Sequence, residues 1–220
     1  MFMDSKLVLF LLIINSFMFS QEKIKKLFND NISFKYEKIT SPDIGVGVMG
    51  SNDRQAYATF FGSNITEKSQ PYFHQIKFKS INFSKKPSEI YLCIYENDNG
   101  LPGKLLHESK YLIYIPTRKA LVTVDLSKRN IKVPQNGYFI GFEWVLSKEN
   151  EMKGNVKTPN LPYNPTISSY TGKTVNLYTK RKKWRKEPDA SLVAGLALDI
   201  SYLHDLLIPN SVIFKGVLNR

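Results

Sequence analysis

Apolar side chains occur at every second position in several segments of the chain. The clearest segment places five of them on one side: Tyr138, Ile140, Phe142, Trp144 and Leu146. Shorter segments at 55–62 and 122–126 alternate in the same way. Because successive side chains of a strand point to opposite faces, this pattern predicts strands with one face in a core.

Two other segments are apolar on both faces. In 90–95 both sets of alternating positions are apolar, and in 192–200 nearly every residue is apolar. Such strands are expected to be covered on both sides. In 75–83 the apolar phase changes between Phe78 and Ile81, which predicts a β-bulge or bend at Lys79–Ser80.

Turn-forming residues separate these segments. The strongest clusters are 97–103 and 134–137, which are rich in Asn, Gly and Pro. Residues 147–165 are polar, contain three prolines and are predicted to form a long loop. About eight to nine short strands with regular turns indicate a sandwich or a barrel. We expect an all-β fold, an antiparallel β-sandwich of jelly-roll type.

The N-terminal residues have a different pattern. Lys6 and the apolar run 7–14 are typical of a secretory signal peptide over 1–20, with cleavage after Ser20. An uncleaved N-terminal anchor is the alternative. Residues 21–44 are predicted to be a linker or to contain a short helix, residues 45–205 the sandwich, and 206–220 a C-terminal tail. The mature chain is expected to lack a transmembrane span and to be secreted or at the cell surface, with the periplasm and outer membrane included.

Charge narrows the class of partner. The 220 residues include 31 Lys and Arg but 19 Asp and Glu, a formal net charge of +12. This excess favours anionic partners such as acidic polysaccharide, lipid headgroups or nucleic acid. Export makes nucleic acid the least natural of these, and none is expected. The densest basic run is 180–186.

Cysteine usage excludes a disulfide framework. Cys93 is the only cysteine, so no intramolecular disulfide can form. It lies in the middle of the doubly apolar segment 90–95. We expect a buried, inert thiol there, since no basic partner lies nearby in the sequence.

Five segments share their order and character with a known kind of module: 76–78, 90–95, 100–106, 124–127 and 133–144. Together they resemble secreted bacterial jelly-roll modules that occur alongside carboxypeptidase-regulatory-like domains in surface proteins of the Bacteroidetes type. The resemblance covers roughly residues 45–200. It implies the fold and the exported location, and it carries no set of catalytic residues.

Two acidic residues are candidates for a site. Glu143 lies opposite the five aligned apolar residues, and Asp199 lies in the second apolar segment with Gly195 and Ala197 on its face. Glycosidases of jelly-roll type use two carboxylates, so Glu143 and Asp199 define an enzyme hypothesis. The alternative is a solvated outer face with ordinary acids, or Glu143 as a ligand contact at the edge of a groove.

The basic run 180–186 surrounds Trp184. Its cations, Lys182 and Arg185 among them, are suited to the acid groups of a glycan while Trp184 stacks on a sugar ring. In the alternative interpretation Trp184 anchors a hairpin into the sandwich and the basic side chains are only solvated.

Other candidate chemistries lack their signatures. His74, His107 and His204 have no metal-ligand spacing, and 97–100 lacks the acidic ligands of a calcium loop. We expect no metal and no cofactor. The sequence thus predicts an exported, non-catalytic protein that binds or scaffolds at the cell surface, with polysaccharide the leading ligand. The alternatives are a glycan-cleaving enzyme and an assembly partner of a surface protein complex.

Overall fold

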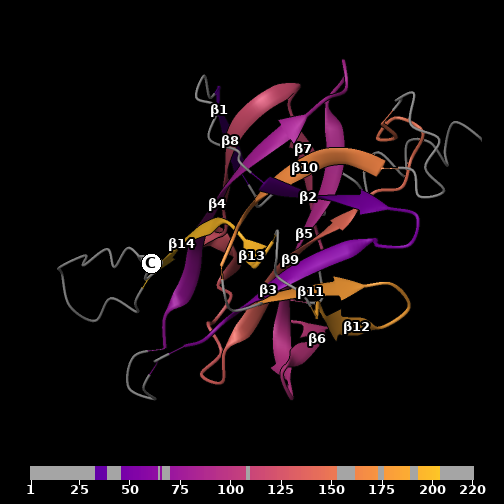
Figure 1. The fold of residues 1–220 in the computed structure, drawn as a ribbon. Coiled ribbons are helices and arrows are strands. Elements are labelled where there is room, and N and C mark those ends of the chain that lie inside the picture. The colour runs from indigo at the N-terminus through magenta and orange to yellow at the C-terminus, as the bar shows by residue number, and fades with distance from the viewer. Residues whose placement is uncertain are drawn as a thin grey trace, which may run out of the picture.

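The computed structural model describes residues 33–38, 46–63, 65, 70–107, 110–152, 162–172, 176–188 and 193–203. They form two antiparallel seven-stranded sheets (Figure 1). Sheet A contains β1 (Ser33–Lys38), β2 (Val46–Ser51), β4 (Tyr72–Asn82), β8 (Arg118–Asp125), β10 (Pro162–Tyr170), β13 (Gly195–Leu196) and β14 (Leu198–Leu203). Sheet B contains β3 (Ala56–Phe61), β5 (Ser88–Asp98), β6 (Leu101–Leu105), β7 (Tyr111–Ile115), β9 (Tyr138–Trp144), β11 (Leu177–Lys180) and β12 (Trp184–Lys186).

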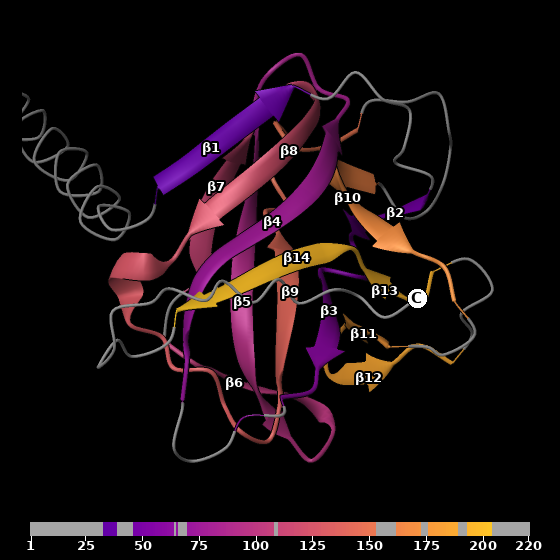
Figure 2. The ribbon, with the colours of Figure 1, turned by 90° about the vertical axis from the view of Figure 1, so that its left-hand side faces the viewer.

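Eight of these strands have jelly-roll topology. In sheet A, β10 pairs with β2 and β4, and β4 pairs with β8. In sheet B, β9 pairs with β3 and β5, and β5 pairs with β7. Among these eight strands, every connection crosses between the sheets except the one from β5 to β7, so each sheet is built from strands distant in sequence. The predicted all-β sandwich is confirmed, and Figure 2 shows β1, β8, β4 and β14 in front of β5 and β9.

The core lies between the sheets and follows the predicted alternation. Tyr138, Ile140, Phe142 and Trp144 are buried, as are the inward residues of β4, β8 and β14. The chain that passes from Leu196 to Ile200 contributes Leu196, Leu198 and Ile200 to the same core. Leu146 departs from the prediction, because β9 ends at Trp144 and Leu146 is exposed.

Several boundaries predicted from sequence are wrong. β1 lies within the 21–44 segment assigned to the linker and pairs with β8 along its whole length. Its Lys35, Glu37 and Lys38 weaken the apolar signal, as is common on edge strands. β10 begins inside the predicted loop 147–165. The loop was predicted because Pro162 and Pro165 cannot donate backbone hydrogen bonds to a sheet, which argues against a strand. Short strands such as β12 and β13 raise the number of strands above the predicted eight to nine.

The predicted bulge is also misplaced. β4 pairs with β8 without a register shift from Gln75 to Asn82, so Ser80 and Asn82 continue the inward face. The phase change in the sequence arises because polar residues are buried there, while Phe83 beyond the strand is exposed. A shift occurs earlier in β4, where Ser201 pairs with Gln75 but Tyr202 with Phe73.

The predicted signal 1–20, residues 21–32 of the predicted linker or short helix, and the tail 206–220 lie outside the described residues. Within the described ranges, no helix is long and apolar enough to cross a bilayer.

Candidate functional site

The outer face of sheet B carries a second apolar cluster, separate from the core between the sheets. Its buried members are Ala58, Cys93, Tyr95, Phe139 and Tyr178. Partly buried Phe60, Tyr91, Leu105 and Trp184 pack against them. The segment 90–95 is therefore covered on both sides, as its sequence predicts.

This cluster is covered because sheet B curls around it. β12 and β6 lie at opposite ends of the strand order of the sheet, yet they contact each other. The β11–β12 hairpin places the Trp184 ring edge-on to Tyr95, with centroids 5.3 Å apart. Next to it, Tyr178 packs edge-on to Phe139 at 4.9 Å. Trp184 thus anchors the hairpin to sheet B. This agrees with the alternative interpretation drawn from the sequence, in which Trp184 holds the hairpin against the sandwich.

Glu143 is the polar centre of this face. The Tyr95 hydroxyl donates a 2.8 Å hydrogen bond to Glu143 Oε1, and Lys180 Nζ lies 3.4 Å from the same oxygen. Lys110 Nζ forms an ion pair with Glu143 Oε2. The Glu143 side chain is only 14% exposed, against 41% for Lys110 and 38% for Lys180.

These contacts decide the charge of Glu143. Burial by itself raises the pKa of its carboxyl, but hydrogen bonds from Lys110 and Tyr95 and the charge of Lys180 outweigh it. The pKa is lowered from its ordinary 4.5. Glu143 is therefore ionised at neutral pH, and two lysines share one carboxylate. Its oxygens are occupied by protein groups, which makes it a residue that positions Lys110 and Lys180.

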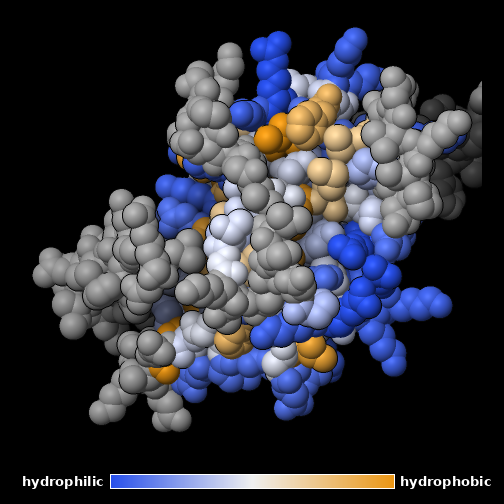
Figure 3. All heavy atoms as spheres, in the orientation of Figure 1, coloured by the Kyte–Doolittle hydropathy of each residue, from blue (hydrophilic) through white to orange (hydrophobic). Residues whose placement is uncertain are grey.

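The hairpin presents an excess of positive charge around Trp184. Lys180 Nζ lies 5.8 Å from the centre of the Trp184 ring, and Arg181 pairs with Asp53 at 3.2 Å. In the part of the chain that the structure describes, no ion pair involves four exposed cations: Lys182, Lys183, Arg185 and Lys186. We call Lys110, Glu143 and residues 180–186 the hairpin surface. Figure 3 shows hydrophilic side chains gathered over this hairpin.

Asp199 lies elsewhere. It is exposed on the outer face of sheet A, opposite Lys77 of β4, while its neighbours Leu198 and Ile200 enter the core. Glu143 points outward from sheet B, so the core of the sandwich separates the two acids. Two carboxylates must flank one glycosidic bond at about 5–10 Å from each other. The structure therefore does not bring Glu143 and Asp199 into one site.

Glu143, Trp184, Lys182 and Arg185 were candidates on sequence grounds, but the partners of Glu143 were not. Tyr95 and Lys110 are 48 and 33 residues away in the chain. They meet Glu143 because Tyr91 of β5 pairs with it and β7 lies on the other side of β5. The doubly apolar character of 90–95 was the one signal that this face is covered.

No protein family, curated protein or solved structure matches the chain. Among the described residues, no three of His, Cys, Asp and Glu lie close enough to hold a metal ion together. The function is therefore inferred from the side chains of this chain itself.

Proposed function

We propose that this is an exported, non-catalytic jelly-roll protein that binds acidic polysaccharide at the cell surface through the hairpin surface. The observation that carries the proposal is a group of four exposed cations, without an ion pair among the described residues, on a hairpin that Trp184 anchors. The predicted signal peptide and the resemblance to secreted bacterial jelly-roll modules support export.

The hairpin surface suits a polyanion for two reasons. Its cations lie on a strand and a tight turn, so their backbone positions are set before binding and little ordering is required. In addition, Glu143 holds Lys110 and Lys180, and Lys180 lies beside the partly exposed ring of Trp184. A sugar ring that contacts Trp184 would place its acid groups among these cations.

The test compares binding of residues 21–220 to dextran sulfate and to dextran, which share a backbone and differ in charge. The variant Lys182→Ala/Arg185→Ala removes two cations from the hairpin surface. Its matched control, Lys77→Ala/Lys79→Ala, removes two from the outer face of sheet A. We expect the hairpin variant to bind dextran sulfate at least tenfold more weakly, and the control to change affinity less than about threefold.

Three outcomes contradict the proposal. Equal losses in the two variants would mean that net charge alone drives binding. No binding to any acidic polysaccharide would favour a protein partner, and release of reducing ends from a bound glycan would indicate an enzyme. Trp184→Phe, which keeps an aromatic anchor, tests the ring contact without removing the hairpin from the second cluster.

A further inference from the structure

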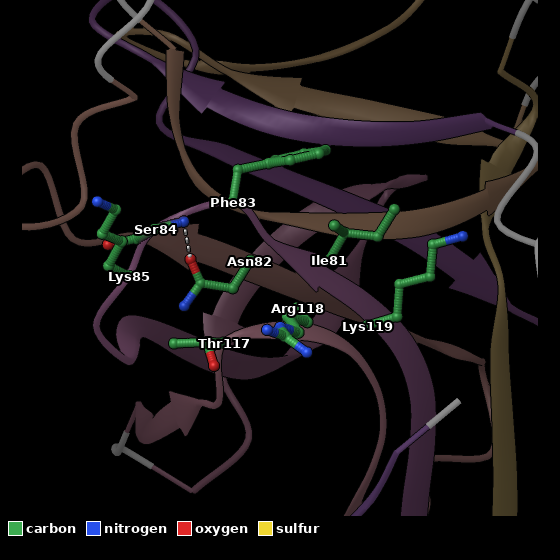
Figure 4. Close-up of a pocket in the computed structure, with 8 residues that line it drawn as sticks. All are labelled: Ile81, Asn82, Phe83, Ser84, Lys85, Thr117, Arg118 and Lys119. Carbon is green, nitrogen blue, oxygen red and sulfur yellow. Dashed lines mark hydrogen bonds between the residues drawn. The ribbon is translucent and has the colours of Figure 1, made fainter. Parts of the chain in front are cut away.

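A second concave site lies at the end of β4, and it shares no residue with the hairpin surface. A cavity of about 570 Å³ is formed by residues 81–85, where β4 ends, and by residues 117–119, where the chain enters β8. This volume lies within the range of small-molecule sites. Figure 4 shows the eight residues that line it, with Phe83 on one side and Thr117 and Arg118 on the other.

The loop that forms this cavity is held in place by buried amide groups. Asn82, at the end of β4, donates hydrogen bonds to the carbonyls of Lys86 at 2.9 Å and Ile115 at 3.2 Å. Its Oδ1 accepts a hydrogen bond from Ser84 N, shown dashed in Figure 4. From sheet A, buried Asn164 accepts one from Phe83 N at 3.0 Å. The backbone on this side of the cavity is therefore preorganised.

Phe83 is exposed although its backbone is fixed. Its side chain is 61% accessible, the largest value among the large apolar side chains that the structure describes. It lines this cavity and also an adjoining one of about 640 Å³ on the other side of the loop. An exposed ring on the wall between two concave surfaces is placed to contact the face of a ring-shaped ligand.

Arg118 occupies an unfavourable backbone conformation. Its φ is 72°, in the left-handed region that favours glycine. Every other positive-φ residue in the described ranges is Gly or Asn, the residues that tolerate this conformation. The turn at 116–118, which carries the chain from sheet B to sheet A, would therefore be less strained with either of them. An arginine here points to a role for its side chain, since strained residues gather at ligand sites.

The charge around the cavity is positive. Lys85, Arg118 and Lys119 line it, and none of its eight lining residues is acidic. None of these three cations forms an ion pair among the described residues. An anionic group is therefore the complementary ligand.

We infer that this cavity binds an acidic sugar unit, with Phe83 against the face of the sugar ring and Arg118 paired with its carboxylate or sulfate. Arginine suits this role because its planar group donates two parallel hydrogen bonds to an acid group. A membrane surface fits less well, because Phe83 lines a concave wall, whereas a bilayer presents a broad, flat surface. The inference is independent of the hairpin surface, since a single sugar unit can bind here without a polymer.

The test uses small ligands and the whole mature chain. Glucose 6-sulfate, glucuronate, glucose and inorganic sulfate are titrated into isotopically labelled residues 21–220, and amide NMR shifts are followed. We expect the two acidic sugars to shift the amides of Ser84, Thr117 and Arg118. Glucose and inorganic sulfate should bind at least fivefold more weakly, because glucose lacks the acid group and inorganic sulfate lacks the sugar ring.

Arg118→Gly is the decisive variant because binding and stability should move in opposite directions. Glycine relieves the backbone strain, so we expect the melting temperature to rise by about 2–4 °C while affinity for the acidic sugars falls at least tenfold. Phe83→Ala should lower affinity about fivefold. Lys77→Ala, which removes one cation from the outer face of sheet A and lies in neither proposed site, is the matched control and should leave it unchanged.

Other results would overturn the inference. Inorganic sulfate binding as tightly as glucose 6-sulfate would leave a plain anion site without a ring contact. Binding to vesicles of anionic lipid that depends on Phe83, with no sugar binding, would assign the loop to a membrane surface. Unchanged affinity in Arg118→Gly would show that the arginine takes no part. If dextran sulfate fails to bind while the acidic sugars bind here, only the hairpin proposal is lost.

Discussion

The outer faces of the two sheets differ in how far their side chains are buried. On sheet B the outward residues form a second apolar cluster, and Glu143 beside it is enclosed by a tyrosine and two lysines. On sheet A the outward residues of β4 and β14 include Lys77, Lys79 and Asp199, and Asp199 is exposed.

An acid that points outward from a sandwich can therefore be either solvated or enclosed by protein groups. Asp199 faces solvent opposite a lysine, where its charge is screened. Glu143 occupies the equivalent place on a strand, but sheet B curls until β12 contacts β6. The curled sheet turns its outer face into a partly buried environment, in which ion pairs and rings acquire a defined geometry.

Removing an aromatic ring from the covered face of sheet B should lower the stability of the protein most. Phe139 is fully buried in the second cluster and contacts Phe60 and Tyr178. We expect Phe139→Ala to lower the free energy of unfolding by about 3–5 kcal/mol. Leu121→Ala on the outer face of sheet A should cost about 1 kcal/mol, because Leu121 is half-buried. Urea unfolding followed by fluorescence measures both, and equal losses would contradict a second core on sheet B.

A smaller effect is expected from the acids themselves. Glu143→Gln leaves Lys110 and Lys180 without their shared carboxylate, and should lower the free energy of unfolding by about 1–2 kcal/mol. The lower end of the range applies if the lysines turn toward water. Asp199→Asn is the matched control and should stay within about 0.5 kcal/mol of the wild type.

The pH dependence separates an ion-pair effect from a packing effect. Since the folded-state pKa of Glu143 lies below its ordinary 4.5, the unfolded chain binds the proton first as pH falls. The stability contributed by Glu143 is thus complete above about pH 4.5 and is lost as the pH falls through the folded-state pKa. The gap between the wild type and Glu143→Gln should therefore narrow on acidification. A constant gap would assign the loss to packing.

Alternation in the sequence was sufficient to predict the sandwich and the outward direction of Glu143. Alternation was not sufficient to predict the partners of Glu143, because these depend on which strands pair and in which register. Glu143 lies opposite Ala56 of β3, and Ala56 lies opposite Lys180 of β11. That order of strands cannot be derived from periodicity. The same limit applies to Asp199. Segment 192–200 was expected to be covered on both sides, but Asp199 is exposed on the outer face of sheet A.

The reaction rate of the Cys93 thiol shows whether the outer face of sheet B is covered, without a measurement of stability. Cys93 points outward from β5, yet it is fully buried in the second cluster. Burial raises the pKa of its thiol from 9.0 to about 12, which lowers the reactive thiolate fraction roughly a thousandfold. We expect Cys93 to react with a thiol-specific reagent only on unfolding. In Thr123→Cys the new thiol on the outer face of sheet A should react promptly, while Cys93 in the same molecule stays protected. Prompt labelling of Cys93 would mean that the two outer faces are alike, and that the hairpin does not cover sheet B.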